Sequence, residues 1–235
     1  MKILFENKAL DATFSCLNQN VGYSVDNITH QFLKKRFQST SNTDTITGIL
    51  TTTESISCFF YGLTNAIEIV LKLYSAADIL LHTEIITDIN YIDSIYFTSV
   101  EAKYFTIELT TTDTYVYLGG IGIGNCYTMP DIKSPWDELF EDNSIVSNSI
   151  DGQVLQNYFE PLKEFKFNIP NNLKETKDEI KEYFVTAGRG GKIWIDLFED
   201  NHDFFMPMYA IILNSFNPKK NGIRYSFDLQ IREAR

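Results

Sequence analysis

Lys103-Tyr104-Phe105-Thr106-Ile107-Glu108-Leu109-Thr110 is the stretch of this sequence that decides its fold. It alternates with a period of two, which is typical of a β-strand with one buried face and one solvent-facing face. Further short strands are predicted on both sides of it, at Thr45–Thr51, Ser55–Tyr61, Ala66–Tyr74, Tyr91–Phe97 and Tyr115–Leu118. Polar turns separate these strands and no strong helical period interrupts them, so the pattern predicts an antiparallel β-sandwich.

Composition agrees with a sheet-rich protein. Aromatic residues make up 14% of the 235 residues, with 18 Phe and 13 Tyr. Aromatic and β-branched residues favour strands over helices. This length suits one large or two small domains, and we expect a sandwich over residues 1–128, a linker or arm over 129–151 and a small α+β domain over 152–235.

The predicted second domain reads β-β-α-β-β-β. Its helix begins after Asn172, which can cap the N-terminus, and carries Ile180 and Phe184 at helical spacing. Gly188 lies where a left-handed C-cap is expected. The alternating run Arg224–Arg235 predicts a final strand, which would tie down the end of the chain.

Charge limits the partners of this protein. The net charge is -11, so phosphate backbones and anionic membrane surfaces should be repelled. No apolar run approaches the roughly 20 residues of a membrane span, and the N-terminus lacks the apolar stretch of a signal peptide. We therefore expect no nucleic-acid partner and no membrane span.

No catalytic or cofactor motif stands out in the sequence. The glycines of Gly119–Gly124 lack the spacing of a dinucleotide-binding loop, and we expect a close-packed strand or bulge there. The acidic loop at Glu199–Asp203 lacks the spacing of an EF-hand. Cys16, Cys58 and Cys126 lack zinc-site spacing, and reduced buried thiols are expected, with a bridge between Cys16 and Cys126 as the alternative.

A candidate interface lies in the C-terminal half. Trp194 and Asp196 should share one strand face, opposite three apolar residues that are expected to point into the core. An outward Trp on an acidic protein is a candidate anchor for a protein partner. The predicted interface residues are Trp194, Asp196, Asp200, His202, Asp203 and Trp136.

The second half also resembles a C-terminal module of tail-associated virion proteins of tailed bacteriophages. The residues that carry the likeness are Ser149–Val154, Ile195–Asp203, Pro207–Tyr209 and Tyr225–Ala234. Phe198 departs from the pattern, since those proteins more often have Trp at this place.

The first half resembles the divergent discoidin-like sandwich that precedes this module. The matching segments are Val21–Ile28, Arg36–Ser39, Phe60–Thr64, Tyr104–Ile107 and Leu118–Gly124. Phe37 replaces a Trp of the pattern, and Gly62 replaces an Asn. Discoidin domains often bind glycans or lipids through loops at one end, although no binding residue of that family maps onto this sequence.

The two resemblances together imply a structural component of a phage tail or baseplate, located in the virion and in the host cytoplasm during assembly. The implied partners are other tail proteins and further copies of the chain in a ring, with no enzyme activity, cofactor or metal. A glycan-binding adhesion module on the virion is the alternative, which would bind a host-surface glycan. A tail-borne hydrolase is the second alternative.

Overall fold

The computed structural model describes residues 1–30, 33–129, 133–141, 145–148, 154–157, 162–172, 174–187, 190–197 and 207–234. The chain divides into two compact units. Unit 1 contains Met1–Met129, Ile193–Tyr209 and Arg235, and unit 2 contains Pro130–Lys192 and Ala210–Ala234. No helix among the described residues is both long and apolar enough to cross a membrane.

Unit 1 is built from strands and two short 3-10 helices. Its elements are β1 (Lys2–Leu4), η1 (Lys8–Asp11), β2 (Thr13–Ser15), η2 (Val25–Thr29), β3 (Phe37–Gln38), β4 (Thr43–Thr64), β5 (Glu68–Tyr74), β6 (Leu80–Ile86), β7 (Ile92–Thr110), β8 (Tyr117–Gly124) and β9 (Tyr127–Thr128). Most of β14 (Lys192–Asp196) and the start of β15 (Met208–Ile212) also belong to it.

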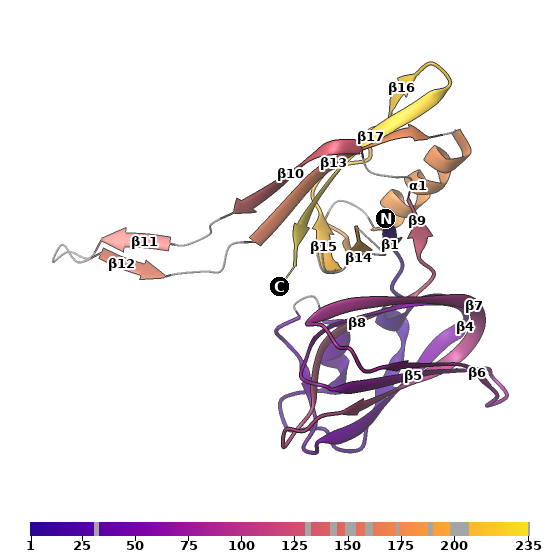
Figure 1. Cartoon of the computed structure of the whole chain (residues 1–235), viewed down its shortest axis with the longest axis vertical. Helices are drawn as coiled ribbons and strands as arrows, with labels where there is room; N and C mark the ends of the chain where they lie inside the picture. The colour runs from indigo at the N-terminus through magenta and orange to yellow at the C-terminus, as the bar shows by residue number, and fades with distance from the viewer. Residues whose placement is uncertain are drawn as a thin grey trace. The chain divides into compact units, whose positions relative to one another are not determined.

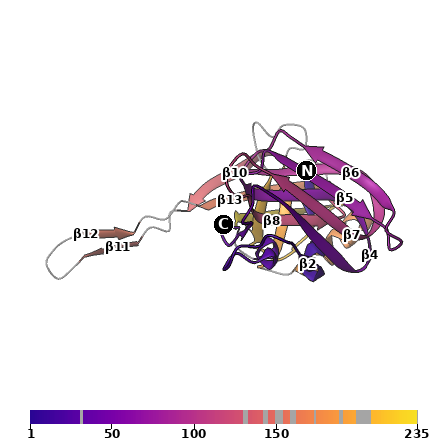
Figure 2. The same cartoon turned by 90° about the horizontal axis from the view of Figure 1, so that it is seen from below.

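The sandwich of unit 1 forms because two long strands bend. The strand order is β3-β8-β4-β7-β5-β6, with β2 paired to β4, and every pairing is antiparallel. The β4–β7 register shifts between Ile49 and Glu54 and again between Ile56 and Cys58. Such bulges bend a strand, and Ile46, Phe59, Leu71 and Ile121 from different parts of the sheet share one buried core. Figure 2 shows β4, β7, β5 and β6 lying side by side.

A second group of strands in unit 1 lies outside this sandwich. β1 pairs with β9 on one side and with β14 on the other, in antiparallel register. The predicted division assigned Ile193–Tyr209 to the second domain, whereas these residues group with unit 1 because β14 is hydrogen-bonded to β1. The other predicted boundaries stay a prediction.

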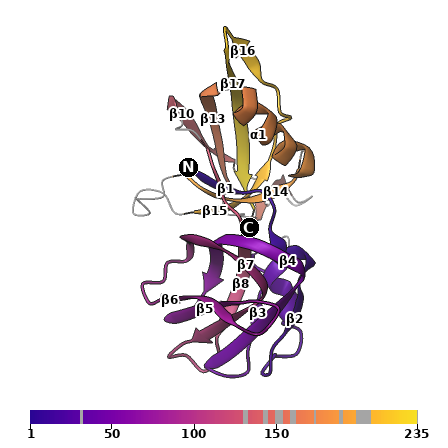
Figure 3. The same cartoon turned by 90° about the vertical axis from the view of Figure 1, so that its right-hand side faces the viewer.

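Unit 2 combines a twisted antiparallel sheet with one helix. Its elements are β10 (Lys133–Glu141), β11 (Ile145–Asn148), β12 (Val154–Asn157), β13 (Leu162–Asn172), α1 (Lys174–Ala187), the rest of β15, β16 (Lys219–Asn221) and β17 (Arg224–Glu233). β10, β13, β17 and β15 are neighbours in the sheet, and β16 pairs with β17. Figures 1 and 3 show α1 lying against this sheet, with β11 and β12 as a separate hairpin in Figure 1.

In the second half, the predicted helix is confirmed as α1, and the predicted final strand that begins at Arg224 is confirmed as β17. Lys133–Glu141, predicted as part of a linker or arm, form β10 and pair with β13. Gly188, the predicted C-cap, lies outside the described residues. The predicted fold class, a mainly β chain with a sandwich and an α+β part, is confirmed.

Candidate functional site

The two central residues of the predicted interface are buried inside unit 1. Trp194 is 1% exposed and Asp196 is 0% exposed. They share a strand face as expected, but Ile193, Ile195 and Leu197 on the opposite face are also buried. The prediction of an outward Trp194 was wrong because it assumed that one face of β14 meets solvent, whereas residues on both faces of β14 are buried.

The glycine-rich strand β8 makes room for the Trp194 indole. A Cβ added at Gly122 would lie 2.5 Å from Trp194 Cδ1, and one at Gly120 would lie 3.4 Å from Trp194 Cζ2. Phe60 lies opposite Gly122 in the β4–β8 pairing, and its ring centroid is 5.7 Å from that of Trp194. The glycine run is therefore a close-packed strand, as its sequence predicted. Because these glycines have no side chains, the Trp194 indole can pack directly on their backbone.

Asp196 is held by hydroxyl groups from β7. Its Oδ2 atom accepts hydrogen bonds from Ser94 Oγ at 2.9 Å and from the Tyr96 hydroxyl at 2.8 Å. Burial raises the pKa of the Tyr96 phenol, and the neighbouring Asp196 carboxylate raises it further. A buried carboxylate satisfied in this way fixes β14 on the sandwich.

The side chains of the other predicted interface residues lie outside the described part of the chain. Trp136 lies in β10, and its side chain lies outside the described part of the chain. Asp200, His202 and Asp203 fall outside the described residues. An interface role for these four residues stays a prediction.

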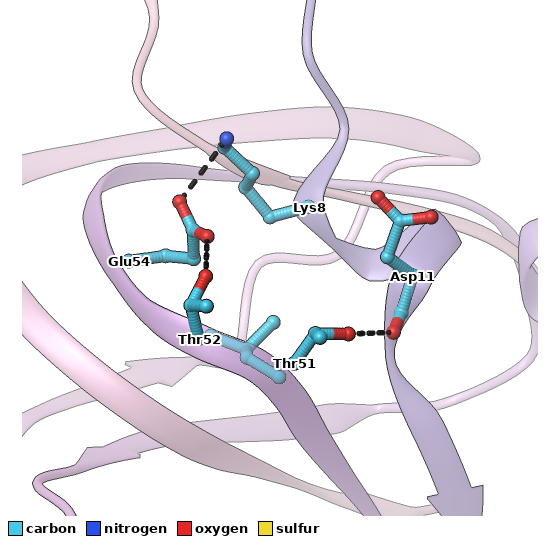
Figure 4. Close-up of a pocket in the computed structure, with 6 residues that line it drawn as sticks. Lys8, Asp11, Thr51, Thr52 and Glu54 are labelled. Atoms are coloured by element: carbon cyan, nitrogen blue, oxygen red, sulfur yellow. Dashed lines mark hydrogen bonds and ion pairs between the residues drawn. The ribbon is translucent and has the colours of Figure 1, made fainter.

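A different feature of unit 1 is a polar pocket on its surface. A pocket of about 400 Å³ is lined by Lys8, Asp11, Leu50, Thr51, Thr52 and Glu54, and we call it the Lys8 pocket (Figure 4). This volume lies within the range of small-molecule sites in proteins. Two other pockets of the described residues, next to Phe216 and next to Trp194, are smaller.

Two segments that are distant in sequence form the walls of the Lys8 pocket. Lys8 and Asp11 are the ends of η1, whose first turn is capped by the Asn7 side chain accepting a hydrogen bond from Ala9 N. The opposite wall is the bulged part of β4, where the register with β7 shifts between Ile49 and Glu54. The Thr51 hydroxyl donates to the Asp11 carbonyl at 2.8 Å and joins the two walls.

Charged groups converge on the mouth of this pocket. Lys8 Nζ lies 3.1 Å from a Glu54 carboxylate oxygen and 3.0 Å from one of Glu6. Figure 4 shows Lys8 and Glu54 pointing toward each other on one side of the pocket, with the Asp11 carboxylate on another. No hydrogen bond from a described residue reaches the Asp11 carboxylate, so its oxygens face solvent as acceptors.

The ion pair of Lys8 and Glu54 shifts the pKa values of both groups away from neutral pH. Partial burial lowers the pKa of Lys8, but hydrogen bonds to Glu6 and Glu54 outweigh this effect and raise it above its usual value. A hydrogen bond from the Thr52 hydroxyl lowers the pKa of Glu54, and a hydrogen bond from Lys8 lowers it further. The Lys8 ammonium and the Glu54 carboxylate are both charged at neutral pH, so they offer a cationic donor and an ionised acceptor.

Sequence reasoning missed the Lys8 pocket. The polar run Thr51–Glu54 interrupts the alternation between two predicted strands, and this interruption was the available signal. Nothing in the sequence places Lys8 and Asp11 beside it, because the contact depends on the register of β2 with β4. Among the described residues, no group of three or more His, Cys, Asp or Glu side chains is arranged to hold a metal ion.

A second surface of unit 1 gathers aromatic residues and an arginine. The Arg36 guanidinium carbon lies 4.0 Å from the centroid of the Tyr117 ring. Asn65 accepts from Tyr117 N and donates to the Tyr115 carbonyl and the Asp113 carboxylate. Because the guanidinium already covers one face of the Tyr117 ring, that face is not free to stack on a ligand.

The chain matches no protein-family model and no curated protein sequence. Solved structures similar to it include a chitosan-binding module from a chitosanase/glucanase of Paenibacillus sp. IK-5, with 17% identity, a TM-score of 0.45, and coverage of 51% of this chain and 99% of that one. The lectin domain of lectinolysin complexed with Lewis b antigen has 16% identity and a TM-score of 0.44, covering 50% of this chain and 95% of that chain.

A fucose-binding module of Streptococcus pneumoniae is also similar, with 12% identity, a TM-score of 0.45, and coverage of 51% of this chain and 94% of that one. Each of these matches spans about half of this chain and nearly all of the other. At identities of 12–17% and TM-scores below 0.5, the likeness assigns no ligand to this chain.

Proposed function

We propose that this protein is a non-catalytic binding protein whose unit 1 holds a neutral or amino-bearing glycan in the Lys8 pocket. The observation that carries the proposal is the set of polar groups around a cavity of about 400 Å³: one ammonium, two carboxylates and two hydroxyls. Sugars present neighbouring hydroxyl groups, each of which donates and accepts. Carboxylates accept from such hydroxyls, and the ammonium donates to them.

The charge of the pocket favours one class of glycan over another. Lys8 contributes one positive charge, whereas Asp11 and Glu54 contribute two negative charges, and Glu6 lies within ion-pair distance of Lys8. The whole chain is also acidic, at -11. Like charges repel, so acidic glycans should bind less well than neutral or amino sugars of the same size.

The carboxylates of the pocket suit binding better than catalysis. A glycoside hydrolase needs a general acid whose pKa is raised so that it is protonated near neutral pH. The pKa of Glu54 is instead lowered by Thr52 and Lys8. Glu54 is therefore ionised at neutral pH and acts as an acceptor.

The role in a phage tail, its protein partners, the ring and the virion location all stay predictions that rest on the sequence resemblance. Glycan binding is compatible with such a role, since an adhesion module on a particle binds its host through sugars. No observation on the described residues favours tail assembly over glycan binding.

A glycan array followed by calorimetry tests the proposal. We expect the purified chain to bind a subset of neutral or amino-bearing glycans, and Glu54→Gln and Asp11→Asn to weaken the best hit by about tenfold each, which is a loss of about 1.4 kcal/mol. Binding that is unchanged in both variants, or an array without hits, would contradict it.

Glu108→Gln is the matched control. Glu108 pairs with Lys72 on the same unit, away from the pocket, in a partly exposed ion pair like that of Lys8 and Glu54. Both substitutions remove one partner of a surface ion pair and should change the free energy of unfolding by similar small amounts. A loss of affinity in Glu54→Gln alone therefore reports on the pocket and not on stability.

A further inference from the structure

Two cysteine thiols meet in unit 1. The Sγ atoms of Cys58 and Cys126 are 2.8 Å apart, although the residues are 68 positions apart in the sequence. Both residues are unbridged. A disulfide bond is about 2.05 Å long, so an approach of roughly 0.8 Å would bring the sulfur atoms to bonding distance.

The surrounding backbone holds these thiols in place. Cys58 lies in β4 opposite Gly124, the last residue of β8, and its Sγ donates to the Gly124 carbonyl at 3.2 Å. Cys126 follows two residues later, and its N–H donates to Ser57 Oγ at 3.4 Å. Each cysteine is thus anchored by the chain that carries the other, and closing the bond requires no change of strand pairing.

We propose that Cys58 and Cys126 form a reversible disulfide when the protein meets a low-molecular-weight disulfide such as oxidised glutathione. In the first step one protein thiolate attacks the small disulfide, which forms a mixed disulfide and releases one reduced thiol. In the second step the other protein thiolate attacks the protein sulfur of the mixed disulfide and releases the second. Two protein thiols are oxidised, one small disulfide is reduced to two thiols, and the two protons pass to those thiols.

The different exposure of the two thiols sets the order of the steps. Cys58 is 0% exposed, whereas Cys126 is partly exposed. A small disulfide therefore reaches Cys126 first, and Cys58 is the resolving thiol. The exchange chemistry depends on the thiolate fraction of the attacking group.

That thiolate fraction is small at neutral pH. Burial raises the pKa of the Cys126 thiol, and the contact with Cys58 raises it further. The other charged or titratable groups that act on it are Lys2 in β1, which lowers its pKa, Asp196 in β14, which raises it, and Tyr96 in β7. We expect slow oxidation at pH 7 and about tenfold faster oxidation for each pH unit above it, with no plateau at pH 9, because the thiolate fraction rises in proportion as long as the pH is below the raised pKa.

Cys16 provides an internal control. It belongs to the same unit and is partly exposed, but its Sγ contacts the Gln19 side chain and no other thiol among the described residues. Burial raises the pKa of the Cys16 thiol to about 11, and the nearby Asp44 and Asp26 also contribute to this rise. Cys16 should therefore remain a free thiol under conditions in which Cys58 and Cys126 are joined.

The experiment uses the full chain, purified under reductant and then held in glutathione buffers of increasing oxidised fraction. Intact mass after alkylation should show a form that has lost two hydrogen atoms and carries two fewer alkyl groups than the reduced chain, and proteolytic mapping should identify a Cys58–Cys126 cross-linked peptide. The midpoint of unfolding should rise by about 5–10 °C in this form, because the closed loop is long. Cys16→Ser should leave all three readouts unchanged, whereas Cys126→Ser should abolish the cross-link and the shift.

Three results would overturn the proposal. Free Cys58 and Cys126 thiols across the whole glutathione series would show that the pair does not close. A cross-link that involves Cys16 would assign the bond to a different pair. A stable glutathione adduct on Cys126 would show that Cys58 does not resolve it. Mapping of the wild-type chain distinguishes these results even if a Cys58→Ser variant fails to fold.

Discussion

The indole of Trp194 lies against the glycines of β8 and between aromatic rings. A Cβ added at Gly122 would lie 2.5 Å from it, and its ring centroid lies 5.7 Å from that of Phe60 and 4.9 Å from that of Tyr209. A large apolar side chain buried in this way stabilises the attachment of β14 by dispersion and by removal of apolar area from water. The glycines are therefore required by the indole as much as by the strand.

We predict that Gly122→Ala destabilises unit 1 by about 1–3 kcal/mol, because the new methyl group overpacks against Trp194. Gly62→Ala is the control, since its added Cβ would meet its nearest neighbour at 3.3 Å instead of 2.5 Å. Urea unfolding measures both. The effect of Gly122→Ala should also shrink in a Trp194→Val background, and equal costs in the two backgrounds would refute the packing argument.

Residue-level features were only partly predictable. The pairing of Trp194 with Asp196 on one face follows from the period of two, and the close-packed role of Gly119–Gly124 follows from its composition. The burial of both faces of β14 could not be predicted from the sequence, because it depends on strands contributed by the first 129 residues. The Lys8 pocket was missed for the same reason, since Lys8 and Glu54 meet only through the fold.

At the scale of elements, α1 is an amphipathic helix docked on a sheet. Ile180 and Phe184 are buried, whereas Val185 is 71% exposed. The Phe184 ring lies 5.2 Å from that of Phe216 and 6.2 Å from that of Phe227 in β17, between centroids. These aromatic contacts join the helix to the sheet of unit 2.

We predict that Phe184→Ala lowers the free energy of unfolding by about 3–5 kcal/mol, because it removes a buried ring and leaves a cavity. Val185→Ala, on the exposed face of the same helix, should change it by less than about 0.5 kcal/mol. Chemical denaturation followed by far-ultraviolet circular dichroism measures both. Similar losses in the two variants would contradict the assigned orientation of α1.

Helix and strand positions were predictable, whereas strand lengths and partners were not. The stripe of Ile180 and Phe184 located α1 because its period is local. Two separate strands were predicted within β4 and two within β7, yet each pair is one bent strand, because the bulges interrupt the alternation without ending the strand. The segment of β10 was predicted to be part of a linker or arm, because Pro135 and the acidic residues mask a strand whose pairing with β13 is not local.

At the scale of the whole molecule, buried tyrosines make the stability of the protein depend on alkaline pH. Burial raises the pKa of Tyr209 to about 12 and raises those of Tyr61 and Tyr96 as well. A group whose pKa is higher in the folded state binds its proton more tightly there. Its stabilising contribution is complete below the unfolded pKa of about 10 and is lost as pH rises above that value.

We therefore predict that tyrosine ionisation leaves the free energy of unfolding nearly unchanged between about pH 7 and pH 9. The free energy of unfolding should then fall between about pH 10 and pH 12. Each tyrosine that stays protonated contributes a slope of about 1.4 kcal/mol per pH unit in that window. Tyr96→Phe should reduce the slope by about this amount, measured by urea unfolding across the pH series. An unchanged slope in Tyr96→Phe would show that this phenol ionises equally in both states.

The most direct test of the account is to locate a bound glycan on unit 1. Amide chemical shifts of the isotope-labelled full chain would be followed during titration with the strongest hit of the glycan array. We predict shifts at Lys8, Asp11 and Thr51–Glu54, which line the Lys8 pocket, and unchanged amides around Arg36 and Tyr117. Shifts confined to Arg36, Tyr115 and Tyr117, or no shifts at a saturating concentration, would contradict the proposed site.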